Sequence, residues 1–132
     1  MIESTVQAIA AMNNRKLPEN ERTAAVHYLR DNPSSEGNTA LVAAMEDEDH
    51  GVRYAASSAL AYIGDPAMAA LLDALAQPGN NKVLRDGAYR VLTDNPSLKV
   101  QETCGPLLAA LKGPQSGIAT MEAAIRLMPT FR

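Results

Sequence analysis

Apolar residues recur along most of the chain at intervals of three and four, the spacing of one face of an α-helix. Pro, Gly, Asn and Asp, which interrupt helices, stand between these groups. The pattern predicts eight helices, near residues 2–13, 19–31, 37–47, 51–63, 66–77, 81–94, 98–111 and 115–128. Because Pro106 lies inside the seventh, we expect that helix to kink or to split into 98–103 and 106–112.

Three of the predicted helices share a repeat. Each contains an arginine, an alanine three residues later and a leucine seven residues later. The three copies are Arg22, Ala25 and Leu29; Arg53, Ala56 and Leu60; and Arg85, Ala88 and Leu92. A helix-breaking segment that contains Pro follows each copy. The arginines are 31 and 32 residues apart (53 − 22 and 85 − 53). A degenerate fourth copy fits Ile118 to Ile125 and is expected to end at Pro129.

Each copy of the repeat follows another amphipathic helix, so the repeating unit is a helix pair. One pair cannot bury its apolar stripe alone, whereas stacked pairs share a continuous core. The period therefore predicts an all-α fold, an α-α superhelix of about four helix pairs in one domain over residues 1–132. The pairs are expected near residues 1–36, 37–65, 66–96 and 97–132.

The segment from Leu41 to Pro66, LVAAMEDEDHGVRYAASSALAYIGDP, resembles the HEAT-like repeat family, including its short form in bilin-lyase-like proteins. An aliphatic helix, an acidic turn, Val-Arg, Ala-Ala, Ala-Leu and Ile-Gly-Asp-Pro carry the resemblance. It implies a right-handed α-solenoid of HEAT-like helix pairs whose second helices line a concave, partner-binding side. It also implies a ladder in which the repeated arginine and the acidic turn bond along the stack: Arg22, Arg53, Arg85, Asp47 and Asp49.

Within that ladder, Arg53 is expected to pair with Asp47 or Asp49. No carboxylate occupies the equivalent position before Arg22 or Arg85. Asn80 and Asn81 are the polar substitutes before Arg85.

The register of the repeat also predicts which positions of the second helices are exposed: Thr23, Val26, His27, Arg30 and Asp31; Tyr54, Ser57, Ser58, Ala61 and Tyr62; Asp86, Tyr89, Arg90, Thr93 and Asp94. Tyrosine and arginine are enriched at interface hot spots. The candidate partner-binding residues are therefore Tyr54, Tyr62, Tyr89, Arg90, Arg30 and His27. The alternative is that the tyrosines only cover the helix surface, with the ring against neighbours and the hydroxyl in water.

Composition narrows the function classes. The chain is 46% hydrophobic but 4% aromatic, which suits helices packed through small aliphatic side chains better than a β-sandwich. A net charge of −3 argues against sequence-independent nucleic-acid binding and against an anionic lipid surface. One cysteine, Cys104, excludes an intrachain disulfide. With no secretory signal and no membrane-spanning run, we expect a cytoplasmic protein.

No catalytic, metal or cofactor site is expected. The acidic segment 46–50 fails as a calcium loop because positions six and twelve, counted from Asp47, are Val52 and Ser58. The two histidines, His27 and His50, are distant in sequence from each other and from Cys104, so a zinc site is not predicted. No activating base accompanies Cys104, which favours a structural thiol.

The leading hypothesis is a non-enzymatic protein-protein interaction module: a scaffold, adaptor or regulatory subunit that binds a protein partner on its concave helix face. The alternative, which rests on the resemblance, is a bilin-lyase-like or cofactor-chaperone protein. The apolar C-terminal segment either packs back on the seventh helix, forms a homodimer through the C-terminal helix, or belongs to a longer array.

Overall fold

The computed structural model describes residues 2–131, which form nine helices and no strand. The helices are α1 (Thr5–Met12), α2 (Glu19–Asp31), α3 (Ser35–Ala44), α4 (His50–Ile63), α5 (Asp65–Leu75), α6 (Lys82–Asp94), α7 (Leu98–Thr103), α8 (Gly105–Lys112) and α9 (Ser116–Phe131). The all-α prediction is confirmed, and the expected elements differ from the observed ones mainly at their ends.

Pro106 and Pro129 behave differently from each other. The predicted split at Pro106 is confirmed, since α7 ends at Thr103 and Pro106 occupies the first turn of α8, where its missing N–H costs nothing. The predicted stop at Pro129 is wrong, because α9 continues through it to Phe131. Phe131 packs against the core and lies beneath the Lys99 ammonium, 4.8 Å from the ring centroid, and this contact holds the last turn in place.

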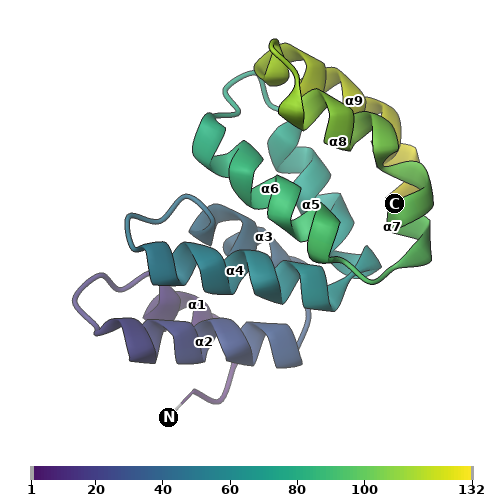
Figure 1. The fold of residues 1–132 in the computed structure, drawn as a ribbon. Coiled ribbons are helices and arrows are strands. Elements are labelled where there is room, and N and C mark those ends of the chain that lie inside the picture. Colours follow the sequence, from purple (N-terminus) through teal and green to yellow (C-terminus); the bar gives the residue numbers. More distant parts are fainter. Residues whose placement is uncertain (1, 132) are drawn as a thin grey trace.

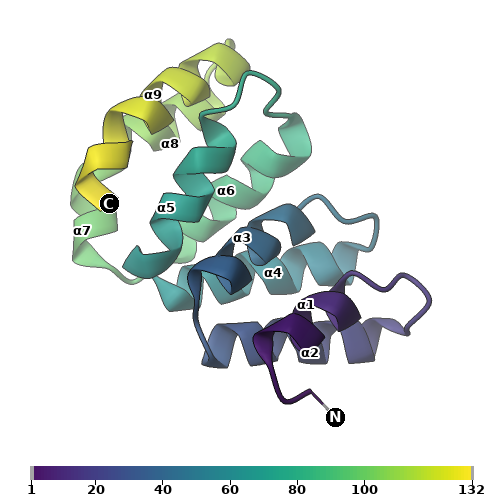
Figure 2. The same cartoon turned by 180° about the vertical axis from the view of Figure 1, so that it is seen from behind.

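The helices form two layers (Figure 1). In the layer nearer the viewer, α4 packs between α2 and α6. In the layer behind, seen in front in Figure 2, α3 packs against α1 and α5. A continuous core of fully buried aliphatic side chains joins the layers, including Leu29, Leu41, Leu60, Leu71 and Leu75. This arrangement is the predicted α-solenoid.

The last helices exchange layers. α8 packs against α6, and α9 returns to pack against α5 and α8. The predicted equivalence of Ile118–Ile125 with the second helices is therefore wrong. The buried residues of α9 are the small Thr120, Ala123 and Ala124, which allow close packing, whereas Ile118 and Ile125 are exposed. Of the three alternatives for the C-terminal segment, packing back on the predicted seventh helix is observed, since α9 packs against α8.

Gly64 allows the sharp turn between α4 and α5. Its φ of +80° is the only positive value among residues 2–131, and its ψ is −136°. Side chains rarely adopt this conformation, so Gly64→Ala should lower the free energy of unfolding by about 1–3 kcal/mol in urea titrations. Gly79→Ala is the control, since nothing lies within 4 Å of the added Cβ. Equal effects of the two substitutions would contradict this explanation.

Candidate protein-interaction face

A buried ion pair fixes the first two helix pairs to each other. Arg22 on α2 is 4% exposed, and its Nη2 lies 2.5 Å from Oδ2 of Asp47, in the turn before α4. The guanidinium also donates from Nη1 to Asp47 Oδ1 (3.2 Å) and from Nε to the carbonyl of Met12 (2.8 Å). One side chain thus joins the end of α1, α2 and the turn before α4.

The predicted pairing of Arg53 with Asp47 or Asp49 is wrong. Arg22 already engages Asp47, and the Asp49 carboxylate accepts from the N–H of Gly51 at 2.8 Å to cap α4. Arg53 instead contacts His50.

In the observed ion pair, the arginine belongs to one helix pair and the acid to the next helix pair. This explains why Arg53 does not pair with Asp47 or Asp49. Asp47 precedes Arg53 by six residues, and the residue six before Arg85 is Gly79, so Arg53 has no acid to meet. The third arginine uses an amide instead: Arg85 donates to Oδ1 of Asn80 at 2.7 Å. Asn80 in turn donates to the carbonyl of Gly117 on α9 at 3.0 Å.

Replacing Arg22 tests the buried pair. Arg22→Met leaves the Asp47 carboxylate, whose side chain is 9% exposed, without its counter-charge. We expect a loss of about 3 kcal/mol or more in the free energy of unfolding at pH 7. Arg15→Met is the control, because Arg15 and Glu48 pair with side chains that are 63% and 81% exposed, and its effect should be negligible.

The same pair predicts a pH dependence. Burial alone would raise the pKa of Asp47, but hydrogen bonds from Arg22 and from the Asp49 backbone N–H outweigh it and hold the pKa below its ordinary value. A lowered pKa stabilises the fold above about pH 4 and the stabilisation is lost on further acidification. The difference in unfolding free energy between wild type and Arg22→Met should therefore shrink as the pH falls from 7 to 3. A difference that stays constant would contradict this assignment.

All six candidate partner-binding residues lie on the second helices. Tyr54 and Tyr62 on α4 are 60% and 72% exposed, and His27 on α2 is exposed. Arg30 on α2 and Tyr89 and Arg90 on α6 are half-buried. The structure therefore places these six side chains on one layer.

The predicted exposure of Val26, Ser57 and Ala61 is wrong, since all three are buried. Each second helix packs against the first-helix layer and also against its neighbours within its own layer. Each second helix therefore buries a wider part of its circumference than a single amphipathic stripe predicts, and fewer of its positions are exposed.

A cation from the neighbouring helix lies over each of the three tyrosines. The Arg30 guanidinium is 5.6 Å from the ring centroid of Tyr62, and the Arg90 guanidinium is 5.0 Å from that of Tyr54. The Lys112 ammonium, at the end of α8, is 4.8 Å from the ring centroid of Tyr89. Such a contact restricts the motion of the cation and of the ring, while the ring stays partly exposed to solvent. Lys112 was not a sequence candidate, because the broken repeat gave no sign that α8 lies beside α6.

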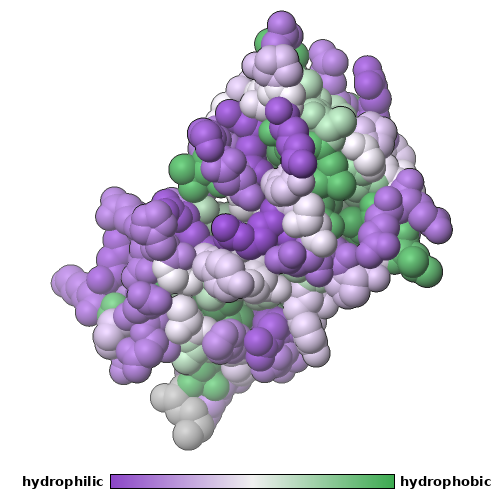
Figure 3. Space-filling model, viewed as in Figure 1, coloured by the Kyte–Doolittle hydropathy of each residue, from purple (hydrophilic) through white to green (hydrophobic). Residues whose placement is uncertain are grey.

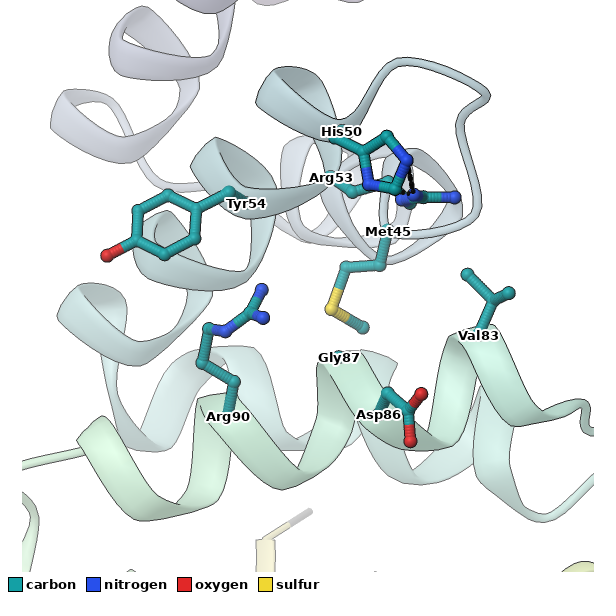
Figure 4. Close-up of a pocket in the computed structure, with 8 residues that line it drawn as sticks. All are labelled: Met45, His50, Arg53, Tyr54, Val83, Asp86, Gly87 and Arg90. Atoms are coloured by element: carbon teal, nitrogen blue, oxygen red, sulfur yellow. Dashed lines mark hydrogen bonds between the residues drawn. The ribbon is translucent and has the colours of Figure 1, made fainter.

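Three grooves follow the boundaries between these helices. The groove between α4 and α6 holds about 430 Å³, and Figure 4 shows Tyr54 and Arg90 side by side along it, with Met45 pointing down to Gly87. Grooves of about 380 Å³ and 540 Å³ lie between α2 and α4 and between α6 and α8. Hydrophilic residues gather over the indented middle of this side of the molecule (Figure 3). We call the exposed side of α2, α4, α6 and α8 the groove face.

Other candidate chemistry stays apart from the groove face. Burial raises the pKa of the Cys104 thiol, partly offset by a contact with Thr103, so the sulfur is held in its less nucleophilic form. Within residues 2–131, no three His, Cys, Asp or Glu side chains are grouped so as to hold a metal ion. Over the same residues, every helix is too short or too polar to cross a bilayer.

Comparison with protein families adds the identity of the repeat. HEAT repeats match residues 6–93, from α1 almost to the end of α6. The chain belongs to the HEAT repeat family. The matched stretch ends before the helices that exchange layers. No curated protein and no solved structure shows a significant match to the chain. HEAT repeats generally mediate protein-protein interactions and are typically non-catalytic.

Proposed function

We propose that this HEAT repeat protein is a non-enzymatic interaction module, a scaffold, adaptor or regulatory subunit, that binds a protein partner on the groove face as its concave side. The observation that carries the proposal is the set of three tyrosines, each in contact with a cation of a neighbouring helix. Aromatic rings with restricted motion lose little entropy on binding, which favours them as contact points.

The shape of the groove face supports a protein partner over a small ligand. Its grooves are open and lie side by side across four helices, whereas small-molecule sites are concave pockets that enclose most of the ligand. Tyr54 and Tyr62 are 60% and 72% exposed, so both rings are accessible to a partner. The surface of a partner protein is large enough to cover both rings.

No side-chain arrangement favours the bilin-lyase-like alternative. The residues that carry that resemblance include Val52, Ala56 and Leu60, which are fully buried in the core and so form the fold rather than a ligand site. A spectral titration with a tetrapyrrole tests it directly.

A homodimer through the C-terminal helix is a separate proposal, supported by the exposure of Ile118 (62%) and Ile125 (51%) on α9. Light scattering after size exclusion should give twice the monomer mass, and Ile118→Glu with Ile125→Glu should give the monomer. A wild-type monomer at high concentration would rule the dimer out.

Removing the aromatic contact points should abolish partner capture. We expect the triple variant Tyr54→Ala, Tyr62→Ala and Arg90→Ala to lose most of the protein that the wild type retains in affinity purification from the native host. The loss of hot-spot residues of this kind typically weakens an interface by 2 kcal/mol or more each, roughly thirtyfold.

The control is a triple variant on the opposite layer: Val6→Ala, Thr39→Ala and Arg126→Ala, all of which replace exposed side chains. Both variants should keep the helical circular dichroism of the wild type and remain folded at the assay temperature. Unchanged capture by a folded groove-face variant would rule out the proposed function.

A further inference from the structure

We propose that the partner segment bound on the groove face is acidic: an extended stretch of a partner protein whose carboxylates meet the cations of the α4–α6 and α6–α8 grooves. This inference rests on the proposed function and specifies the chemistry of the partner.

The distribution of unpaired charge points to an acidic partner. The chain carries 12 basic and 15 acidic residues. Four ion pairs join residues 2–131, so seven basic side chains in that range have no carboxylate partner: Lys16, Arg53, Arg85, Arg90, Lys99, Lys112 and Arg126. Four of the seven, Arg53, Arg90, Arg85 and Lys112, line these two grooves. Among the described residues that line either groove, Asp86 is the only acid, and Lys82 binds it at 2.9 Å.

The groups that hold these cations in place include no carboxylate, so the positive charge is not cancelled. Arg90 donates to the Ser57 hydroxyl at 3.2 Å while its guanidinium lies over Tyr54. Arg53 contacts His50, and Lys112 lies over Tyr89. In Figure 4, Arg90 extends from α6 toward Tyr54, and Arg53 lies beside His50; both line the α4–α6 groove. A positioned guanidinium with free N–H groups is suited to bidentate binding of a carboxylate.

Acidic groups near the ends of the second helices favour a short peptide over a long polyanion. Glu46 and Glu48 precede α4, and Asp31 and Asp94 end α2 and α6. A nucleic acid or an anionic membrane that extended beyond the grooves would meet these carboxylates, and like charges repel. An acidic segment that crosses the helices would meet the four cations between them and one carboxylate, Asp86, which Lys82 already pairs with.

The test is fluorescence anisotropy on the full chain with a labelled peptide of alternating Glu and Gly. A length of about ten residues, at ~3.3 Å per residue, crosses helices spaced about 10 Å apart. We expect saturable binding that weakens as salt rises. Arg53→Gln with Arg90→Gln should weaken it about tenfold. The matched control, Lys16→Gln with Arg126→Gln, removes the same charge outside the grooves and should have little effect.

Three outcomes would overturn the acidic partner: equal binding of a Gln-Gly peptide, tighter binding of a single-stranded oligonucleotide, or equal weakening by the control pair. If the double variant unfolds, Arg53→Gln alone continues the test, because within residues 2–131 the Arg53 side chain hydrogen-bonds only to His50. The proposed function is tested separately. If a captured partner has no acidic segment, and its capture is lost in the tyrosine variant, the chain is still an interaction module and only the acidic specificity is wrong.

Discussion

Lateral packing of α2, α4 and α6 in one layer is the constraint on which the rest of the molecule depends. The alanine of each repeat, Ala25, Ala56 or Ala88, is fully buried and lets the helices approach closely. Close approach brings the cation of one helix over the tyrosine of the next, and it leaves grooves where the helix surfaces diverge. The candidate interaction face is thus a consequence of how the repeats stack.

The stack is joined by different chemistry at each step. A buried ion pair, Arg22 with Asp47, links the first two helix pairs, and an amide, Asn80, links the third to α9. The third helix pair has an amide in place of a carboxylate, so Arg53 has no acid to pair with. Its side chain contacts His50 and lines the α4–α6 groove on the groove face. In this way the same arginine position is structural in one repeat and available to a partner in the next.

Periodicity was sufficient to predict most of the fold, because a helix pair can bury its apolar stripe only by stacking. It also placed Tyr54, Tyr62, Arg30 and Arg90 on one layer. It failed where the outcome depended on contacts between pairs. Ser57 and Ala61 are buried because α4 also packs against its neighbours within the layer. Lys112 reaches Tyr89 only because α8 lies beside α6. The last helix, α9, lies in the other layer because its small residues fit against α5. None of these contacts has a local sequence signal.

The most direct test of the central claim is site-specific photocrosslinking in the native host, with a photoreactive phenylalanine analogue at a single position. An aromatic analogue at Tyr54 preserves the ring that faces solvent, and Val6 on α1, which is 71% exposed, serves as the opposite-layer position. The account predicts a discrete protein adduct from position 54 and none from position 6. Adducts from position 6 with none from position 54 would contradict it, because the binding surface would then lie on the first-helix layer.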